Sequence, residues 1–315
     1  MTVTSPFHDQ LSRIPVRAAS IELAGRVTRY WEYGDPGAAV TLVLVHGFRG
    51  DHHGLEPVVA QLPGLRMICP DLPGFGESEP LGGRHDLAGY AGWLRALITK
   101  LEIEKDFLLL GHSFGSIVVS AALAPDPIEP TDYPPRRPDR LILINPIAAP
   151  ALQGPRGILT RLAVFYYWLA SILPDRLGFA LLRNRVIVRV MSMAMAKTRD
   201  RSLRGWIHDQ HDRYFSAFSD RKVVLEAFRA SVGADVSSFA AMITVPTLLI
   251  AAERDDITAL PAQYRLAALF PDATLRVIAG VGHLIHYEAP EQAAQYIREF
   301  LASRPDPSAR PGEPS

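Results

Sequence analysis

The sequence predicts an α/β fold in which helices flank both faces of a mostly parallel, twisted sheet. Six short runs rich in Val, Ile and Leu are nearly continuous rather than alternating, which is typical of strands buried on both faces. Segments with helical spacing separate most of these runs, so strands and helices alternate along the chain. Residues 147–240 contain no such run and have helical spacing, which predicts an all-helical insertion between two core strands.

The expected elements of the core follow in chain order. Runs over 19–23 and 27–33 flank a turn at Gly25 and predict an antiparallel hairpin that starts the sheet. We expect the buried strands at 40–45, 66–70, 107–110, 141–144, 247–251 and 274–278. We expect the accompanying helices at 86–101, 113–123, 261–270 and 290–301.

The chain is expected to divide into a core in two parts and one inserted helical lid. The expected segments are a first core part at 1–146, the lid at 147–240, a second core part at 241–303 and a Pro-rich, disordered tail at 304–315. The expected lid helices are 157–173, 176–196, 199–218 and 221–232. Because the first of them is apolar nearly all round, we expect it in the interior of the lid, with the lining of an entrance over the site as the alternative.

Composition and charge argue against several classes of partner. The 315 residues contain 33 Lys and Arg and 33 Asp and Glu, and this balance gives no electrostatic footprint for nucleic acid or an anionic membrane. The most apolar segment, 162–173, is too short for a transmembrane segment. The N-terminal residues lack the apolar run of a secretory signal, and Cys69, the single cysteine, is expected to be buried and inert. We therefore expect a cytoplasmic protein, and the oligomeric state stays open.

One motif gives the strongest indication of chemistry. Gly111-His112-Ser113-Phe114-Gly115 directly follows an expected strand and precedes an expected helix. This context is typical of a nucleophile elbow, in which a tight strand-to-helix turn holds a hydroxyl above the sheet and glycines let the neighbouring backbone pass. A glycine-rich turn with an exposed serine is the alternative interpretation. We expect Ser113 to be a nucleophile.

A serine hydroxyl needs a base, and the base needs a group that orients it. His283 lies in a loop after the last expected strand and is the expected base, whereas His286 is expected to support that loop or begin the next helix. Three carboxylates compete for the role of the acid at the end of an earlier strand. Asp255 is the expected acid, with Asp256 and then Glu253 as alternatives, and the chain order Ser, Asp, His fits this type of elbow.

An oxyanion hole requires two backbone N–H donors beside the nucleophile. Phe114, the residue after the nucleophile, is expected to supply one. The segment His46-Gly47-Phe48-Arg49-Gly50 closes an early strand, and the Phe48 N–H is the expected second donor. Each such donor contributes about a hundred- to a thousandfold in rate.

Together these pieces resemble the α/β-hydrolase superfamily, and within it the serine esterases that carry a lid. The resemblance rests on His46-Gly47-Phe48, the segment 70–78 with its Asp-x-x-Gly-x-Gly turn, the Ser113 elbow, the Asp255 loop and Gly282-His283. It covers 20–145 and 241–302 and implies a structural role for Asp71. Relatives that attack carbon carry Asp where this chain has Ser113, so serine favours acyl transfer. Ala252 replaces a glycine often found three residues before the acid.

The leading hypothesis is a cofactor-independent hydrolase that cleaves an ester of a hydrophobic small molecule through an acyl-enzyme, since the apolar lid predicts a covered, apolar pocket. A carbon–carbon bond hydrolase, a thioesterase or a perhydrolase would use the same three residues, and a non-catalytic ligand receptor also occurs on this fold. No metal site is expected. His208 and His211 have the spacing of a metal-binding pair but are expected on a polar helix face, and His52 and His53 at a loop or pocket rim.

Overall fold

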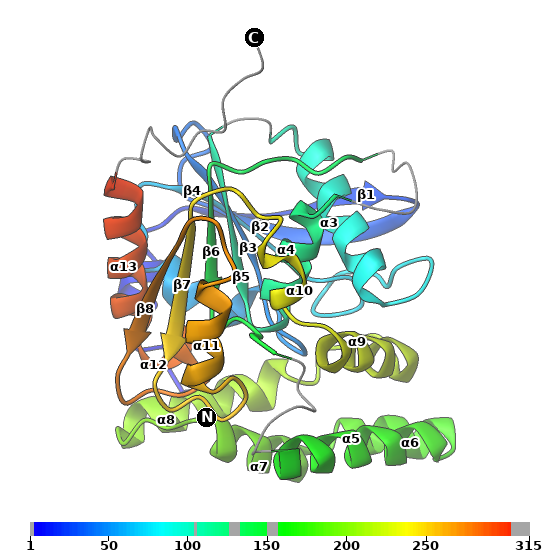
Figure 1. The fold of residues 1–315 in the computed structure, drawn as a ribbon. Helices are drawn as coiled ribbons and strands as arrows, with labels where there is room; N and C mark the ends of the chain where they lie inside the picture. The colour runs from blue at the N-terminus through cyan, green and yellow to red at the C-terminus, as the bar shows by residue number, and fades with distance from the viewer. Residues whose placement is uncertain (1–2, 104–105, 126–132, 150–156, 304–315) are drawn as a thin grey trace.

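The computed structural model describes residues 3–103, 106–125, 133–149 and 157–303, and the tail predicted at 304–315 lies outside them (Figure 1). Within the described residues an eight-stranded sheet has the order β1-β2-β4-β3-β5-β6-β7-β8. The strands are β1 (Val16–Leu23), β2 (Arg26–Tyr33), β3 (Thr41–Val45), β4 (Arg66–Pro70), β5 (Phe107–His112), β6 (Arg140–Ile144), β7 (Thr247–Ala252) and β8 (Ala273–Ile278). The predicted mostly parallel α/β sheet is confirmed, because only β1 with β2 and β2 with β4 pair antiparallel.

Both faces of the sheet are buried, which explains the continuous apolar runs. Along β3, Val43 and Val45 belong to one core cluster, and Leu42 and Leu44 belong to the other. Cys69 belongs to the second cluster, where burial raises the pKa of its thiol, as expected for an inert cysteine. Alternate residues of a strand thus meet different layers of helices.

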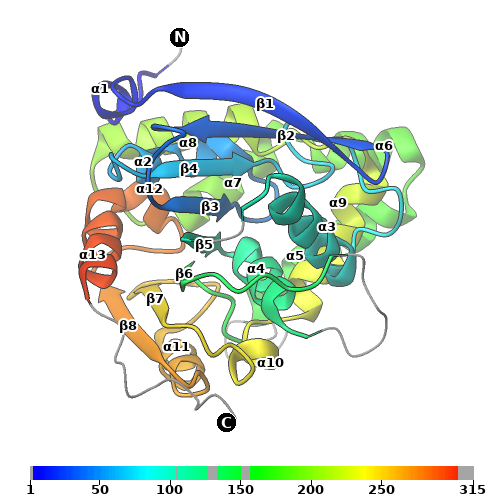
Figure 2. The ribbon, with the colours of Figure 1, turned by 90° about the horizontal axis from the view of Figure 1, so that it is seen from above.

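Helices cover the two faces of the sheet as separate layers. The helices of the core are α1 (His8–Leu11), α2 (Glu56–Val59), α3 (Leu87–Lys100), α4 (Phe114–Leu123), α10 (Ser237–Ala240), α11 (Leu260–Ala267), α12 (Ile285–Glu288) and α13 (Pro290–Ala302). Helices α3, α4 and α11 lie on one side of the sheet and α13 lies on the other (Figure 2). The loops after the parallel strands therefore open at one edge of the sheet, where sites form in such folds.

A helical layer covers this edge. Its members follow β6 and precede β7 in the chain: α5 (Gly157–Ile172), α6 (Asp175–Leu182), α7 (Arg185–Met195), α8 (Arg201–Tyr214) and α9 (Arg221–Gly233). In Figure 1 α5, α6, α7 and α8 form the lowest part of the molecule, below the ends of β7 and β8, and α9 lies above α5 and α6. Within the described residues, every helix is too short or too polar to cross a bilayer.

Two expectations about this layer are wrong. A single helix over 176–196 was expected, but α6 ends at Leu182, and the Asn184 side chain begins α7 by accepting hydrogen bonds from the N–H groups of Val186 and Ile187. The first helix, α5, was expected in the interior of the layer. It buries Tyr167 and Ala170 but leaves a row of large apolar side chains more than half exposed.

Candidate active site

Ser113 occupies the turn between β5 and α4 in a backbone conformation that residues other than glycine rarely adopt. Its φ is 53° and its ψ is −118°, and such a strained residue costs about 1–3 kcal/mol. Glycines make this turn possible: a Cβ on Gly115 would lie 2.2 Å from the Val45 carbonyl oxygen, and one on Gly111 would lie 2.6 Å from the Gly115 carbonyl oxygen. The sequence between β5 and α4 therefore forms a sharp elbow that carries the Ser113 hydroxyl.

The structure brings Ser113, His283 and Asp255 into one hydrogen-bonded chain. Oγ of Ser113 lies 2.8 Å from Nε2 of His283, and Nδ1 of His283 lies 2.7 Å from Oδ2 of Asp255. Because an ionised carboxylate only accepts hydrogen bonds, Nδ1–H donates to Asp255, and Nε2 accepts from the Ser113 hydroxyl. The three residues come from the loops that follow β5, β8 and β7.

Asp255 is buried yet held in its ionised form. Burial raises the pKa of this carboxyl group. The opposing effect of His283 and of the N–H groups of Ile257 and Thr258 is larger, so the pKa lies below its usual value. Asn145 Nδ2 and Thr258 Oγ1 each donate to Oδ2 at 3.0 Å. Asn145 was missed in the sequence, although a polar residue directly after a buried strand is a signal that points to it.

The competing side chains have other partners. Asp256 lies 2.5 Å from Nζ of Lys197, and Glu253 accepts a hydrogen bond of 2.8 Å from the Gly280 N–H. His286 is buried in the short helix α12, where its ring centroid lies 4.0 Å from that of His112. Asp255, the first of the three candidates, is the carboxylate that lies against the imidazole of His283.

The two expected oxyanion donors lie on either side of the Ser113 elbow. Phe114 is the first residue of α4, and Phe48 lies in the turn that Gly50 closes by donating to the Gly47 carbonyl. A Cβ on Gly47 would lie 3.2 Å from Cβ of Ser113, so this turn approaches the elbow closely. Within the described residues neither the Phe48 N–H nor the Phe114 N–H has a hydrogen-bond acceptor.

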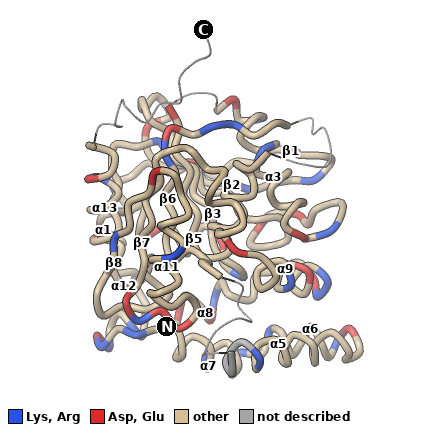
Figure 3. The backbone as a smooth tube through the Cα atoms, in the orientation of Figure 1, with Lys and Arg blue, Asp and Glu red and all other residues tan. Residues whose placement is uncertain are grey.

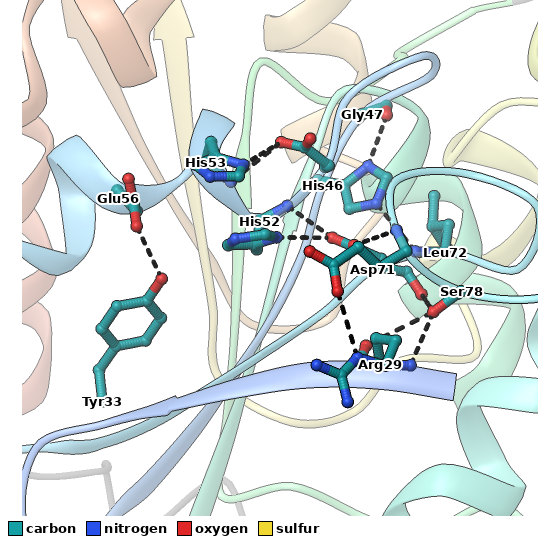
Figure 4. A network of polar contacts seen from close by, with 12 residues as sticks. Arg29, Tyr33, His46, Gly47, His52, His53, Glu56, Asp71, Leu72 and Ser78 are labelled. Carbon is teal, nitrogen blue, oxygen red and sulfur yellow. Dashed lines mark hydrogen bonds and ion pairs between the residues drawn. The ribbon is translucent and has the colours of Figure 1, made fainter. Parts of the chain in front are cut away.

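A buried polar network supports the turn that carries Phe48 (Figure 4). Nε2 of His46 accepts from the Leu72 N–H, so its Nδ1–H donates to the Gly47 carbonyl. The Asp71 carboxylate accepts hydrogen bonds from the backbone N–H of His52, from Nδ1 of the same residue and from the backbone N–H of Glu77. Burial raises the pKa of the Asp71 carboxyl group, but His52 and the other donors lower it overall. These contacts support the structural role expected for Asp71.

Arg49 joins the same turn to the helical layer, a role that no pattern in the sequence indicated. Its side chain is buried, with φ of 61° at its own backbone. The guanidinium donates to the carbonyl oxygens of Phe215 and Leu182 at 3.0 and 2.6 Å and to the hydroxyl of Tyr167 at 3.2 Å. It also lies over the Phe215 ring, 4.4 Å from the centroid. The position next to Phe48 is therefore fixed by partners more than a hundred residues away.

A cavity of about 180 Å³ adjoins Ser113 and His283 beneath the helical layer. Its apolar lining consists of Phe48, Leu55, Met191, Met195, Phe215, Ile257 and Leu284. Its polar lining includes His112, His211 and His286. Burial lowers the pKa of both His112 and His211 to about 3, so both rings are neutral near pH 7.

Two further pairs of histidines take no part in the hydrogen-bonded chain of Ser113, His283 and Asp255. His208 and His211 were expected on a polar helix face, but both are buried, and the Oγ of Ser192 lies 2.6 Å from Nδ1 of each. Asp51, His52 and His53 form the one cluster with metal-ligand spacing that the described residues contain. Nδ1 of His52 contacts Asp71, which lies outside this cluster, and Nδ1 of His53 contacts Asp51. These hydrogen bonds explain the arrangement of the cluster without an ion.

Comparison with known proteins identifies the family of this chain. A model described as the alpha/beta hydrolase family matches residues 42–296. The chain belongs to this family, and the family assigns it to the hydrolases.

Individual relatives are distant. The dihydrolipoyllysine-residue acetyltransferase component of an acetoin cleaving system from Pseudomonas putida is 29% identical over 89% of this chain and 68% of its own length. A 2-hydroxy-6-oxononadienedioate/2-hydroxy-6-oxononatrienedioate hydrolase from Cupriavidus pinatubonensis is 26% identical, with 85% of this chain and 89% of that protein covered. A solved esterase from Thermogutta terrifontis superposes with a TM-score of 0.68 at 23% identity and covers 90% of this chain and 98% of its own.

Proposed function

We propose that this protein is a serine hydrolase that cleaves an ester of a hydrophobic small molecule through an acyl-enzyme. The observation that carries the proposal is the continuous chain of hydrogen bonds from the Ser113 hydroxyl through His283 to Asp255. In this arrangement Ser113 is the nucleophile, His283 the base and Asp255 the group that orients the base.

The proposed reaction proceeds by two acyl transfers. The Ser113 Oγ attacks the ester carbonyl while its proton passes to Nε2 of His283, and the buried, ionised Asp255 stabilises the resulting imidazolium. The N–H groups of Phe48 and Phe114 stabilise the oxygen that becomes negative. The proton then goes to the leaving alcohol, and water, activated by His283, releases the acid and restores Ser113.

The cavity supports a small, largely apolar acyl or alcohol group. Its volume of about 180 Å³ is below the roughly 300–1,000 Å³ of pockets that hold drug-sized ligands. Met191 and Met195 of α7 and Phe215 after α8 form part of its wall. The helical layer acts in this proposal as the lid that keeps water from the Ser113 hydroxyl.

The decisive experiment compares wild type with Ser113→Ala. We expect wild type to hydrolyse short p-nitrophenyl esters faster than long ones and to react with a fluorophosphonate probe, whereas Ser113→Ala does neither and keeps the wild-type circular dichroism spectrum. Ester turnover that persists in the folded variant would refute Ser113 as the nucleophile. A wild-type chain that fails to take up the probe would instead support a non-catalytic ligand-binding role.

A second candidate is a carbon–carbon bond hydrolase with the same three residues. The similarity to the 2-hydroxy-6-oxononadienedioate/2-hydroxy-6-oxononatrienedioate hydrolase from Cupriavidus pinatubonensis favours it. Turnover of a dienoate or diketone substrate with no turnover of esters would select this function, and rapid cleavage of acyl thioesters alone would select a thioesterase.

A further inference from the structure

The outer side of the helical layer exposes a group of large apolar side chains. We call it the outer helical face and define it by Leu162, Phe165, Trp168 and Ile172 of α5, Leu177 of α6, and Val186, Val190 and Met193 of α7. Each of these side chains is more than half exposed. Scattered exposed apolar residues are normal, but such a concentration on neighbouring elements marks an interaction surface.

Helix α7 carries apolar side chains on its exposed side as well as on its buried side. Val186, Val190 and Met193 lie at i, i+4 and i+7 and are exposed, so they share one side of the helix. The buried side carries Val188 and Ser192, and the Ser192 hydroxyl contacts His208 and His211 of α8. A helix that met only water on its outer side would place its apolar residues inward. The outer side of α7 is therefore adapted to an apolar environment.

Helix α5 also carries apolar side chains on its exposed side. Leu162, Phe165, Trp168 and Ile172 recur at helical spacing on the side opposite the buried Tyr167 and Ala170. The rings of Phe165 and Trp168 lie 5.6 Å apart. Inside the layer, α5 and α6 contact α9 and α7 contacts α8, and Figures 1 and 2 place α5, α6 and α7 together on the far side from the sheet.

The charge on these helices is strongly one-sided. Residues 157–195 contain five Arg, one Asp and no Lys or Glu, although the whole chain is neutral. Figure 3 shows these basic positions along α5, α6 and α7. Arg161, Arg176, Arg183 and Arg185 are exposed, and among the described residues no carboxylate lies within ion-pair distance of them. The neutral composition of the chain therefore conceals a basic region around the outer helical face.

We propose that the outer helical face docks on an anionic phospholipid surface. Aromatic and aliphatic side chains surrounded by arginines have the composition of an interfacial helix, in which the apolar groups enter the boundary of the acyl chains and the arginines meet lipid phosphates. A second copy of the chain fits less well, because a two-fold interface would bring the same basic regions together without acidic partners. Docking would place α7, which also lines the cavity through Met191 and Met195, at the lipid surface.

Sedimentation with lipid vesicles tests the proposal on the full-length chain. We expect binding to vesicles of phosphatidylcholine and phosphatidylglycerol, weaker binding to phosphatidylcholine alone, and a decrease as salt rises. The double variant Phe165→Asp/Trp168→Asp should lower the partition coefficient at least about tenfold. Leu269→Asp is the matched control, because Leu269 is also exposed but lies between α11 and β8, at the opposite edge of the sheet.

Three outcomes overturn the proposal. They are no binding of wild type to anionic vesicles, equal binding of wild type and the double variant, and a wild-type dimer that the double variant converts to monomer, which would assign the face to a second copy. Hydrolysis of a water-soluble ester by the double variant, at the wild-type rate, shows that its fold is intact. Failure of docking and failure of the proposed esterase activity therefore give different results.

Discussion

Nη2 of Arg49 donates a 2.6 Å hydrogen bond to the carbonyl oxygen of Leu182, and this contact links the turn of Phe48 to the end of α6. The guanidinium has further acceptors on Phe215 and Tyr167, so one side chain of the core holds three parts of the helical layer. Arg49 is a positioning residue in this view. It acts on the turn of Phe48 through the backbone, and its guanidinium contacts the helical layer.

Arg49→Met should loosen the helical layer, because it leaves buried carbonyl oxygens without donors. We expect the free energy of unfolding to fall by about 3 kcal/mol and hydrogen exchange to rise in α6 and near Phe215. Arg183→Met is the control, since Arg183 is exposed on the same layer and its loss should change stability by less than about 0.5 kcal/mol. Equal exchange rates in wild type and Arg49→Met would contradict the linking role.

Two adjacent carboxylates provide a direct test of the acid. Asp255→Asn should lower kcat for ester hydrolysis by about four orders of magnitude, because the amide cannot hold His283 in the required tautomer. Asp256→Asn should leave kcat within a few-fold of wild type, since Asp256 pairs with Lys197 instead. Steady-state kinetics of both purified variants measure the difference. The reverse ranking would transfer the role to Asp256.

Gly115→Ala should prevent the elbow from forming. The new Cβ would lie 2.2 Å from the Val45 carbonyl oxygen, a distance that backbone atoms cannot tolerate, so we expect a loss of about 3 kcal/mol or more. Gly92→Ala is the matched change on α3, where a Cβ meets nothing within 4 Å, and it should stabilise the helix by about 0.5–1 kcal/mol. Urea unfolding of the two variants gives both values, and similar stabilities would show that the turn has more space than these distances allow.

The buried histidines predict a loss of stability in mild acid. Burial lowers the pKa of His112 and His211 to about 3, whereas an unfolded histidine has a pKa near 6.5. Below about pH 6.5 the unfolded state takes up protons that the folded state does not, so stability falls as the pH drops from about 6.5 towards about 3. The cost is on the order of 2 kcal/mol for each ring at about pH 5. Asp71 and Asp255, whose pKa values are lowered from about 4, add losses only at more acidic pH.

Unfolding by urea at about pH 8 and about pH 5 measures this effect. His211→Gln should remove the contribution of one ring and make the free energy of unfolding depend less on pH. Ser192 can still contact His208 in this variant. His8→Gln is the control, because His8 is exposed near the N-terminus and should leave the slope unchanged. A wild-type protein equally stable at both pH values would show that neither ring resists protonation.

The parts of the fold that depend on local pattern could be predicted from the sequence. The apolar runs of β3 to β8 are continuous because both faces of each strand are buried, and the elbow at Ser113 has glycines on both sides that its turn requires. The alternation of these elements was sufficient to predict a mostly parallel sheet, in which the loops of Asp255 and His283 lie at the same edge, but it did not predict the order of the strands.

Features that depend on distant partners could not be predicted. Arg49 reaches Leu182 across 133 positions, which leaves no local pattern, and the position of Asn145 after a buried strand did not indicate its partner Asp255, 110 positions away. The all-round apolar character of α5 indicated burial but not which side the sheet and α9 would occupy. The break between α6 and α7 depends on the Asn184 cap, which lies between two apolar stretches that helical spacing alone joins.

The register of the sheet has a consequence for how this chain can change over generations. Ile144, the last residue of β6, stands beside Ile250 of β7, so the whole helical layer is inserted between two strands that are neighbours in the sheet. The helical layer between them can be shortened, exchanged or recombined while the hydrogen-bonded strands of the sheet keep their register. Proteins that descend from this one can therefore acquire a new substrate preference without a change in the residues that cleave the bond.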